Sequence, residues 1–132
     1  MSADTLRRAA ALLRERADAA TPGPWSAADE YGLIPEADPA WCISQMRPGY
    51  QSMSPTEGYV GDVAEVWCER KDACPDADYI ATMHPGVGLA LADWLDLMAW
   101  QHETFGQNMS GFLLDHSKRA EDVARLILGA TS

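Results

Sequence analysis

The sequence predicts an α+β fold: an N-terminal helix, a small antiparallel sheet with a long loop, a main amphipathic helix and a C-terminal helix. Apolar residues recur at helical spacing before residue 21 and again after residue 76. Between these stretches, short runs of alternating apolar and polar residues are separated by glycine and proline, which is typical of strands and turns. Because 132 residues is an ordinary size for one domain, we expect a single domain over residues 1–132.

The first helix is expected over residues 4–20. Asp4 is placed to cap it, and the TPGP run of residues 21–24 ends it, because proline removes a backbone donor and fixes φ. Its predicted inner face consists of apolar residues three or four positions apart, namely Leu6, Ala9, Ala10, Leu13, Ala17 and Ala20.

The sheet is expected within residues 25–68. We predict short strands at 25–27 and 31–34, a better one at 41–46 and the clearest at 59–68. Strict alternation places Asp62 on one face of this last strand and Glu65 and Trp67 on the other, and Gly61 indicates a bulge. Strands 41–46 and 60–67 are expected to pair as an antiparallel hairpin, joined by a loop over residues 47–58 that is rich in turn-forming residues.

The remaining helices are expected over residues 76–84, 85–104 and 115–128. Asp76 can cap the first, Pro85 suits the first turn of the second, and Asp115 or Ser117 can cap the third, which Gly129 closes. The apolar residues of the main helix are Val87, Leu91, Trp94, Leu95 and Met98, with Leu89, Leu97 and Trp100 widening the arc. The inner face of the last helix is Ala120, Val123, Ala124 and Ile127.

The charge of the chain narrows the classes of partner. The formal net charge is −10, and residues 26–103 carry fourteen acidic against three basic side chains. Such a field repels nucleic-acid phosphates and anionic lipids, so we expect neither direct nucleic-acid binding nor membrane binding. It favours a basic protein partner or imitation of a polyanion; the alternative is that the charge serves solubility alone.

Nothing in the sequence reads as an export signal or a membrane span. No run approaches the roughly 18 apolar residues that a span requires, and the N-terminus mixes arginines and acids with its alanines. We therefore expect a cytoplasmic protein whose three cysteines are reduced thiols.

A small-ligand or metal-binding module built on three cysteines and a histidine is one alternative to a protein-binding role. Cys42, Cys68, Cys74 and His84 could supply a Cys₃His zinc site, although their spacing departs from the usual zinc motifs. Free cysteines are commonly buried, so structural thiols are the simpler interpretation. No phosphate loop or nucleophile motif occurs, and Asp93 and Asp96 read as a solvated stripe, so we predict neither a cofactor nor a catalytic residue.

An interaction surface is the remaining candidate for function. Tryptophan, tyrosine and methionine are enriched at protein interfaces, and five tryptophans are many for so small a core. The candidate protein-binding residues are Trp41, Tyr50, Met53, Tyr59, Trp67 and Trp100, with the acids Asp62 and Glu65. Two alternatives stay open: all five tryptophans belong to the core, or helix residues 87–100 supply the face of a homodimer.

Two phrases of the sequence resemble those of a known group of proteins. The opening LRRAAALLRERADAATPGPW and the later DADYIATMHPGVGLALADWL are similar to phrases in small accessory proteins of actinobacteria and their phages, usually labelled hypothetical or similar to early-region accessory proteins of lambdoid phages. The resemblance covers residues 1–25 and roughly 63–95. It implies an accessory gene of a phage or mobile element, acting in a bacterial or phage-infected host cell, and it carries over no catalytic residue.

Overall fold

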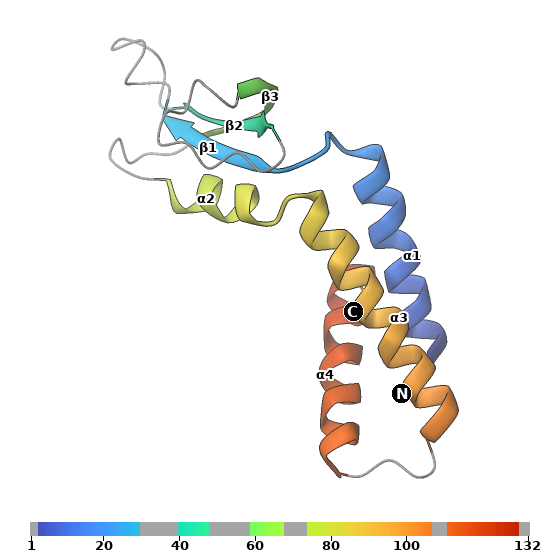
Figure 1. The fold of residues 1–132 in the computed structure, drawn as a ribbon. Helices are drawn as coiled ribbons and strands as arrows, with labels where there is room; N and C mark the ends of the chain where they lie inside the picture. Colours follow the sequence, from blue (N-terminus) through green and yellow to red (C-terminus); the bar gives the residue numbers. More distant parts are fainter. Residues whose placement is uncertain (1–2, 30–39, 48–58, 68–73, 107–110, 130–132) are drawn as a thin grey trace. The chain divides into compact units, whose positions relative to one another are not determined.

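The structure, a computed structural model, describes residues 3–29, 40–47, 59–67, 74–106 and 111–129. Its elements confirm the α+β fold (Figure 1), and the chain divides into two compact units: a helical unit of residues 1–19 and 88–132, and a sheet unit of residues 20–87. The interpretation as one domain stays a prediction, so each unit is described by itself. In chain order the elements are α1 (Ala3–Ala19), β1 (Trp25–Asp29), β2 (Ala40–Met46), β3 (Tyr59–Trp67), α2 (Pro75–Thr82), α3 (Pro85–Phe105) and α4 (Gly111–Leu128).

The helical unit has an interior built mainly from alanine. The small side chains let α1, α3 and α4 approach closely around a few larger ones. The predicted inner face of α4 is confirmed, and that of α1 is confirmed except for Ala17 and Ala20, which do not belong to the cluster. Ala92 and Ala99 of α3 were not predicted to be buried. The buried cluster is Leu6, Ala9, Ala10, Ala92, Leu95, Met98, Ala99, Ala120 and Ala124.

The inner stripe of α3 is narrower than its sequence suggests. Leu89, Leu97 and Trp100, which widen the predicted apolar arc, are 38%, 50% and 51% exposed. Because Ala92 and Ala99 occupy the contact instead, these larger residues stay at the surface of the helical unit.

Three of the predicted helix starts differ from the structure. α1 begins at Ala3, so Asp4 lies in its first turn instead of capping it. The residue before α2 is Cys74, with Pro75 first in the helix, so Asp76 lies in the first turn instead of capping it. Proline suits that first position because its missing N–H would have no helical partner. α4 begins at Gly111, which leaves Ser117 inside the helix and 3% exposed. Gly129, with φ of 71°, ends α4 as expected.

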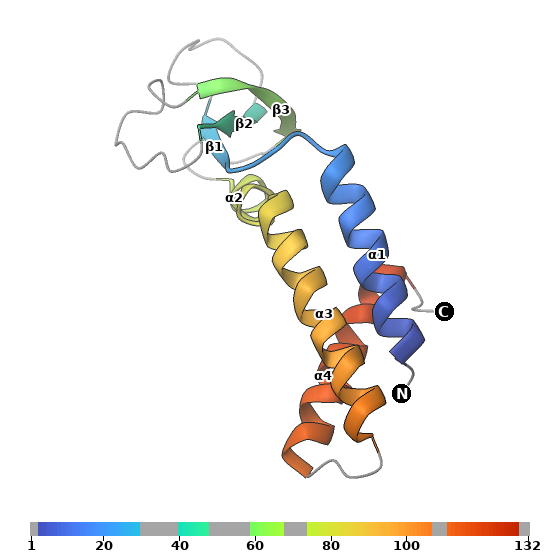
Figure 2. The same ribbon diagram turned by 45° about the vertical axis from the view of Figure 1, so that its right-hand side comes forward.

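The sheet unit is built on three antiparallel strands in the order β1-β2-β3. β1 pairs regularly with β2, from Trp25 opposite Gln45 to Asp29 opposite Trp41. α2 packs on β1 and β2, and Figures 1 and 2 show it nearer to β1 than to β3. β3 is therefore an edge strand of the described sheet. The predicted strand at 31–34 and loop residues 48–58 lie outside the described residues.

Candidate protein-binding surface

Two irregularities in the pairing of β2 with β3 decide which side chains share a face. Ile43 pairs with Ala64 but Ser44 pairs with Asp62, which leaves Val63 as an extra residue in β3. A second shift, between Gln45 and Met46, leaves Val60 extra in the same way. A bulge was expected at Gly61; the two extra residues lie on either side of the Gly61–Asp62 pair.

The bulge at Val63 moves Asp62 to the other face of β3. Residues opposite each other in an antiparallel pair have side chains on the same face. Cys42 and Ser44 lie on one face of β2, and their partners are Glu65 and Asp62 respectively. Trp67, two residues after Glu65 in β3, lies on the same face. The expectation from strict alternation, which separated Asp62 from Glu65 and Trp67, is therefore wrong.

Asp62, Glu65 and Trp67 form a row along one face of the edge strand, here called the β3 surface. The two acids are exposed and Trp67 is 67% exposed. The Ser44 hydroxyl lies 3.5 Å from a carboxylate oxygen of Asp62, which agrees with their shared face. The arrangement offers two carboxylates and the ring of an indole, and each of these groups attracts cations.

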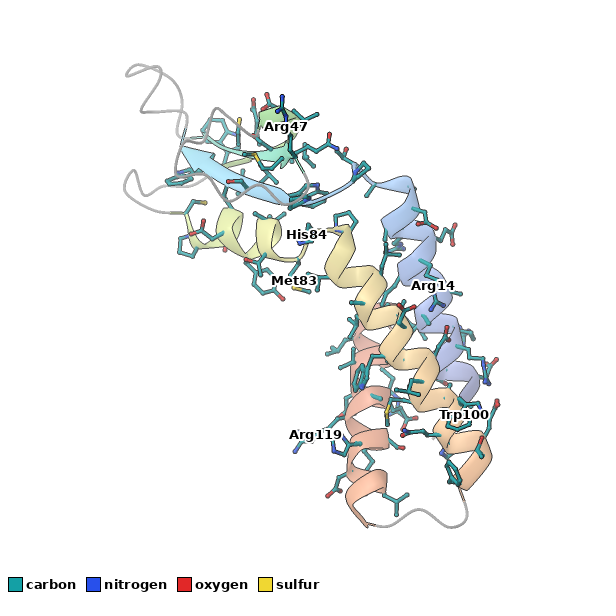
Figure 3. All side chains as sticks on the ribbon, in the orientation of Figure 1. Arg14, Arg47, Met83, His84, Trp100 and Arg119 are labelled. Atoms are coloured by element: carbon teal, nitrogen blue, oxygen red, sulfur yellow. The ribbon has the colours of Figure 1, made fainter. Side chains whose placement is uncertain are left out.

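The net charge of the sheet unit also favours the binding of cations. Residues 20–87 contain eleven acidic and three basic side chains, a net charge of −8, whereas the helical unit nets −2. Within the part of the sheet unit that the structure describes, Arg47 is the only lysine or arginine, and it is exposed at the end of β2 (Figure 3). The β3 surface thus lies in a strongly negative field.

The outer side of α2 exposes a second apolar group that the sequence analysis missed. Ala77 and Ala81 are buried, whereas Tyr79, Ile80 and Met83 are 69%, 39% and 44% exposed. No role was predicted for these three residues. The signal that could have revealed them was the pair of alanines at i, i+4 spacing, which fits a close approach of α2 to the sheet.

The side chain of His84, in the second of the two resembling phrases, packs against the turn at the end of the first. It lies at the turn between α2 and α3 (Figure 3), and its Nδ1 accepts a hydrogen bond from the backbone N–H of Gly86 at 3.1 Å. A Cβ atom at Gly23 would lie 2.6 Å from this Nδ1 and 3.0 Å from the ring Cγ. The ATPGPW turn and the HPG turn are therefore packed together inside the sheet unit, and glycine is required for that approach.

The candidate metal ligands are not gathered in the described structure. Cys42 and Cys74 are 5% and 0% exposed, and one ring nitrogen of His84 already accepts the Gly86 N–H. Across the described ranges, no three cysteine, histidine, aspartate or glutamate side chains are placed to hold a metal ion. Cys68 lies outside those ranges, so the four-ligand site stays a prediction without structural support.

The other aromatic and methionine residues predicted to bind a protein are not part of the β3 surface. Trp41 is partly buried, and its indole Nε1 is buried without a hydrogen-bond partner among the described atoms. Tyr59 begins β3 opposite Met46. Tyr50 and Met53 lie outside the described residues.

Trp100 belongs to the helical unit, not to the sheet unit. It meets Phe105, which is 46% exposed, edge to face with ring centroids 5.8 Å apart and ring planes at 88° (Figure 3 labels Trp100). Edge-to-face geometry is favourable for aromatic pairs. Together with Leu97, the pair forms an exposed group, here called the α3 ridge.

Ion pairs connect α1 with α3 in the same unit. Arg14 donates to Asp93 at 2.8 Å and to Asp96 at 2.6 Å, so these two acids hold α1 rather than only facing solvent. Arg7 pairs with Glu103, with one contact of 2.9 Å. The hydrogen bond from Arg7 lowers the pKa of the Glu103 carboxyl below its ordinary value.

Comparison with known proteins adds no relative. No protein-family model, curated protein or solved structure matches the chain. Within the described ranges, none of the helices combines the length and apolar character needed to cross a bilayer.

Proposed function

We propose that the chain is a small non-enzymatic accessory protein that binds a basic protein partner through the β3 surface of its sheet unit. The observation that carries this proposal is the row of Asp62, Glu65 and Trp67 on one face of an edge strand. Buried or rim aromatic anchors beside complementary charges are typical of protein-binding sites. The sequence resemblance supports an origin in a phage or mobile element.

Charge reversal on the β3 surface tests this function. The probe is a capped peptide of about eight residues in which lysine and valine alternate, titrated into the full chain by isothermal calorimetry. The test variant is Asp62→Lys with Glu65→Lys. The control, Asp115→Lys with Asp122→Lys, reverses two exposed acids on α4 and changes the net charge equally.

The proposal expects the wild type and the α4 control to bind the peptide with similar affinity. The β3 variant should bind at least about tenfold more weakly, because both of its local attractions become repulsions. If the wild type does not bind, or all three proteins bind alike, the β3 surface is not a site for basic segments.

Self-association through the α3 ridge is a second candidate. It is favoured by the exposed Trp100–Phe105 pair beside Leu97, and by the small net charge of the helical unit, which permits two copies to approach. Light scattering of the purified chain tests it. Dimers should dissociate on Leu97→Ser with Trp100→Ser and persist on Leu126→Ser, a change at a 70% exposed position of α4. A monomer at every concentration would exclude this role.

A further inference from the structure

We propose that the partner segment binds as an additional strand along the outer edge of β3, with basic side chains at alternate positions. This inference rests on the proposed function and specifies how the β3 surface is used. Edge strands present unpaired backbone donors and acceptors, which extended peptides use in β-strand addition. Among the described residues, β3 pairs with β2 alone, and no described strand pairs with its other edge.

The regular part of β3 sets the position of the incoming strand. From Ala64 to Trp67 the pairing with β2 runs without interruption, and the bulges lie before it, at Val63 and Val60. A strand that follows this regular stretch can form successive backbone hydrogen bonds with it. Beyond Val63 the bulge bends the edge, which limits how far the ladder continues.

The two faces of β3 specify the side chains that the incoming strand needs. On one face lie Glu65 and Trp67, with Asp62 brought to the same side by the bulge. On the other face lie Ala64 and Val66. Because strand side chains alternate in direction, lysine or arginine at every second position would meet the carboxylates and the indole, and small apolar residues between them would meet Ala64 and Val66.

The same charges argue against a second copy of β3 as the occupant. Pairing two β3 edges would bring the acidic rows together, and like charges directly opposite each other destabilise a sheet. Exposed edges in natural proteins commonly carry charges and bulges that prevent such self-pairing. The acids therefore discriminate between partners, excluding another acidic edge and accepting a basic strand.

Backbone methylation of the probe separates strand addition from simple charge attraction. Two further versions of the alternating peptide are made, one N-methylated at every lysine and the other at every valine. In an extended strand the N–H groups of alternate residues point to opposite edges, so one version blocks the edge that faces β3 and the other blocks only the outer edge. Sliding the peptide by one residue cannot rescue the blocked version, because it would carry the lysines to the wrong face. Reversing its direction would keep the lysines on the right face but would replace antiparallel by parallel pairing, which is less stable.

The expected result is a loss of at least about tenfold in affinity for one methylated peptide and near wild-type affinity for the other. Equal behaviour of the two methylated peptides, whether both bind or neither does, overturns strand addition while leaving the proposed function intact. Failure of the unmethylated peptide to bind the wild type removes the proposed function itself. A version with its lysines and valines in two separate blocks should also bind more weakly, because it keeps the charge but loses the alternation.

Discussion

At the scale of single residues, the contact between Gly23 and His84 ties the turn after α1 to the turn after α2 within the sheet unit. The ring of His84 occupies the space that any side chain at Gly23 would need, and its Nδ1 is held by the Gly86 N–H. The local sequence of neither turn indicates that the two turns are in contact. The glycine in the ATPGPW phrase reads as a helix stop, and its second role follows only from the fold.

Substitution Gly23→Ala should destabilise the chain by about 1–3 kcal/mol, because the new Cβ would meet the root of the imidazole ring. The matched control is Gly61→Ala, where nothing lies within 4 Å of the added Cβ. The measurement is the free energy of unfolding from urea titration. In a His84→Ala background the cost of Gly23→Ala should shrink, and equal costs for the two glycines would contradict the packing described.

The Arg7–Glu103 pair makes a prediction about pH. Since the hydrogen bond from Arg7 lowers the pKa of Glu103 in the folded chain, the stabilisation is present above the ordinary value of 4.5 and is lost as the pH falls through the lower folded value. Glu103→Gln should therefore lower the thermal midpoint slightly at pH 7, and this difference should close in acid.

The effect is small because both side chains are about half exposed. The matched control is Glu15→Gln, which removes one exposed acid from α1 where the described residues show no ion pair. The measurement is the thermal midpoint of the wild type and both variants at neutral pH and below about pH 3. A Glu103→Gln difference as large in acid as at neutrality would show that the ion pair is not its source.

At the scale of elements, α3 separates core from surface within a few residues. Leu95 is fully buried in the alanine-rich cluster, whereas Leu97, two positions later, is 50% exposed. Leu95→Ala should cost about 2–5 kcal/mol of unfolding free energy, because it opens a cavity among rigidly packed helices.

Leu97→Ala is the control and should change stability by no more than about 0.5 kcal/mol. Urea unfolding of both variants provides the comparison. Similar costs at the two positions would mean that Leu97 is buried in the protein in solution, for example by a second copy covering the α3 ridge.

The helices also show which structural features can be predicted from sequence patterns and which cannot. Helical periodicity predicted α1, α3 and α4 well, because each apolar stripe repeats over several turns. It did not predict that Ala92 and Ala99 are buried, because alanine is common on both the buried and the exposed face of a helix and does not distinguish them. The start of α4 was missed because Asp115 and Ser117 resemble caps, while Gly111 does not.

The residues of the candidate site were predicted from the sequence, but their arrangement on one face was not. Trp67, Asp62 and Glu65 were chosen by residue type and by charge, and all three are exposed on β3. Their common face could not be predicted, because it depends on the bulge at Val63, which is defined by pairing with β2 and not by β3 alone. The apolar outer side of α2 was missed for a similar reason: the sheet selects Ala77 and Ala81 and leaves the larger residues outside.

At the scale of the whole molecule, the net charge is divided unevenly between the two units. The sheet unit holds −8 of the net charge of −10, and the helical unit combines paired ions with the exposed α3 ridge. Basic segments should therefore be drawn to the sheet unit, since complementary charge raises both the encounter rate and the specificity of binding. Self-association, if it occurs, should use the helical unit.

Mapping the bound peptide by backbone amide chemical shifts tests this division most directly. The full chain is labelled with ¹⁵N and titrated with the alternating lysine–valine peptide. Our account predicts that the largest shifts fall on residues 60–67 and their β2 partners, with α3 and α4 nearly unchanged. Shifts concentrated on Leu97, Trp100 and Phe105, or spread evenly over every exposed acid, would contradict it.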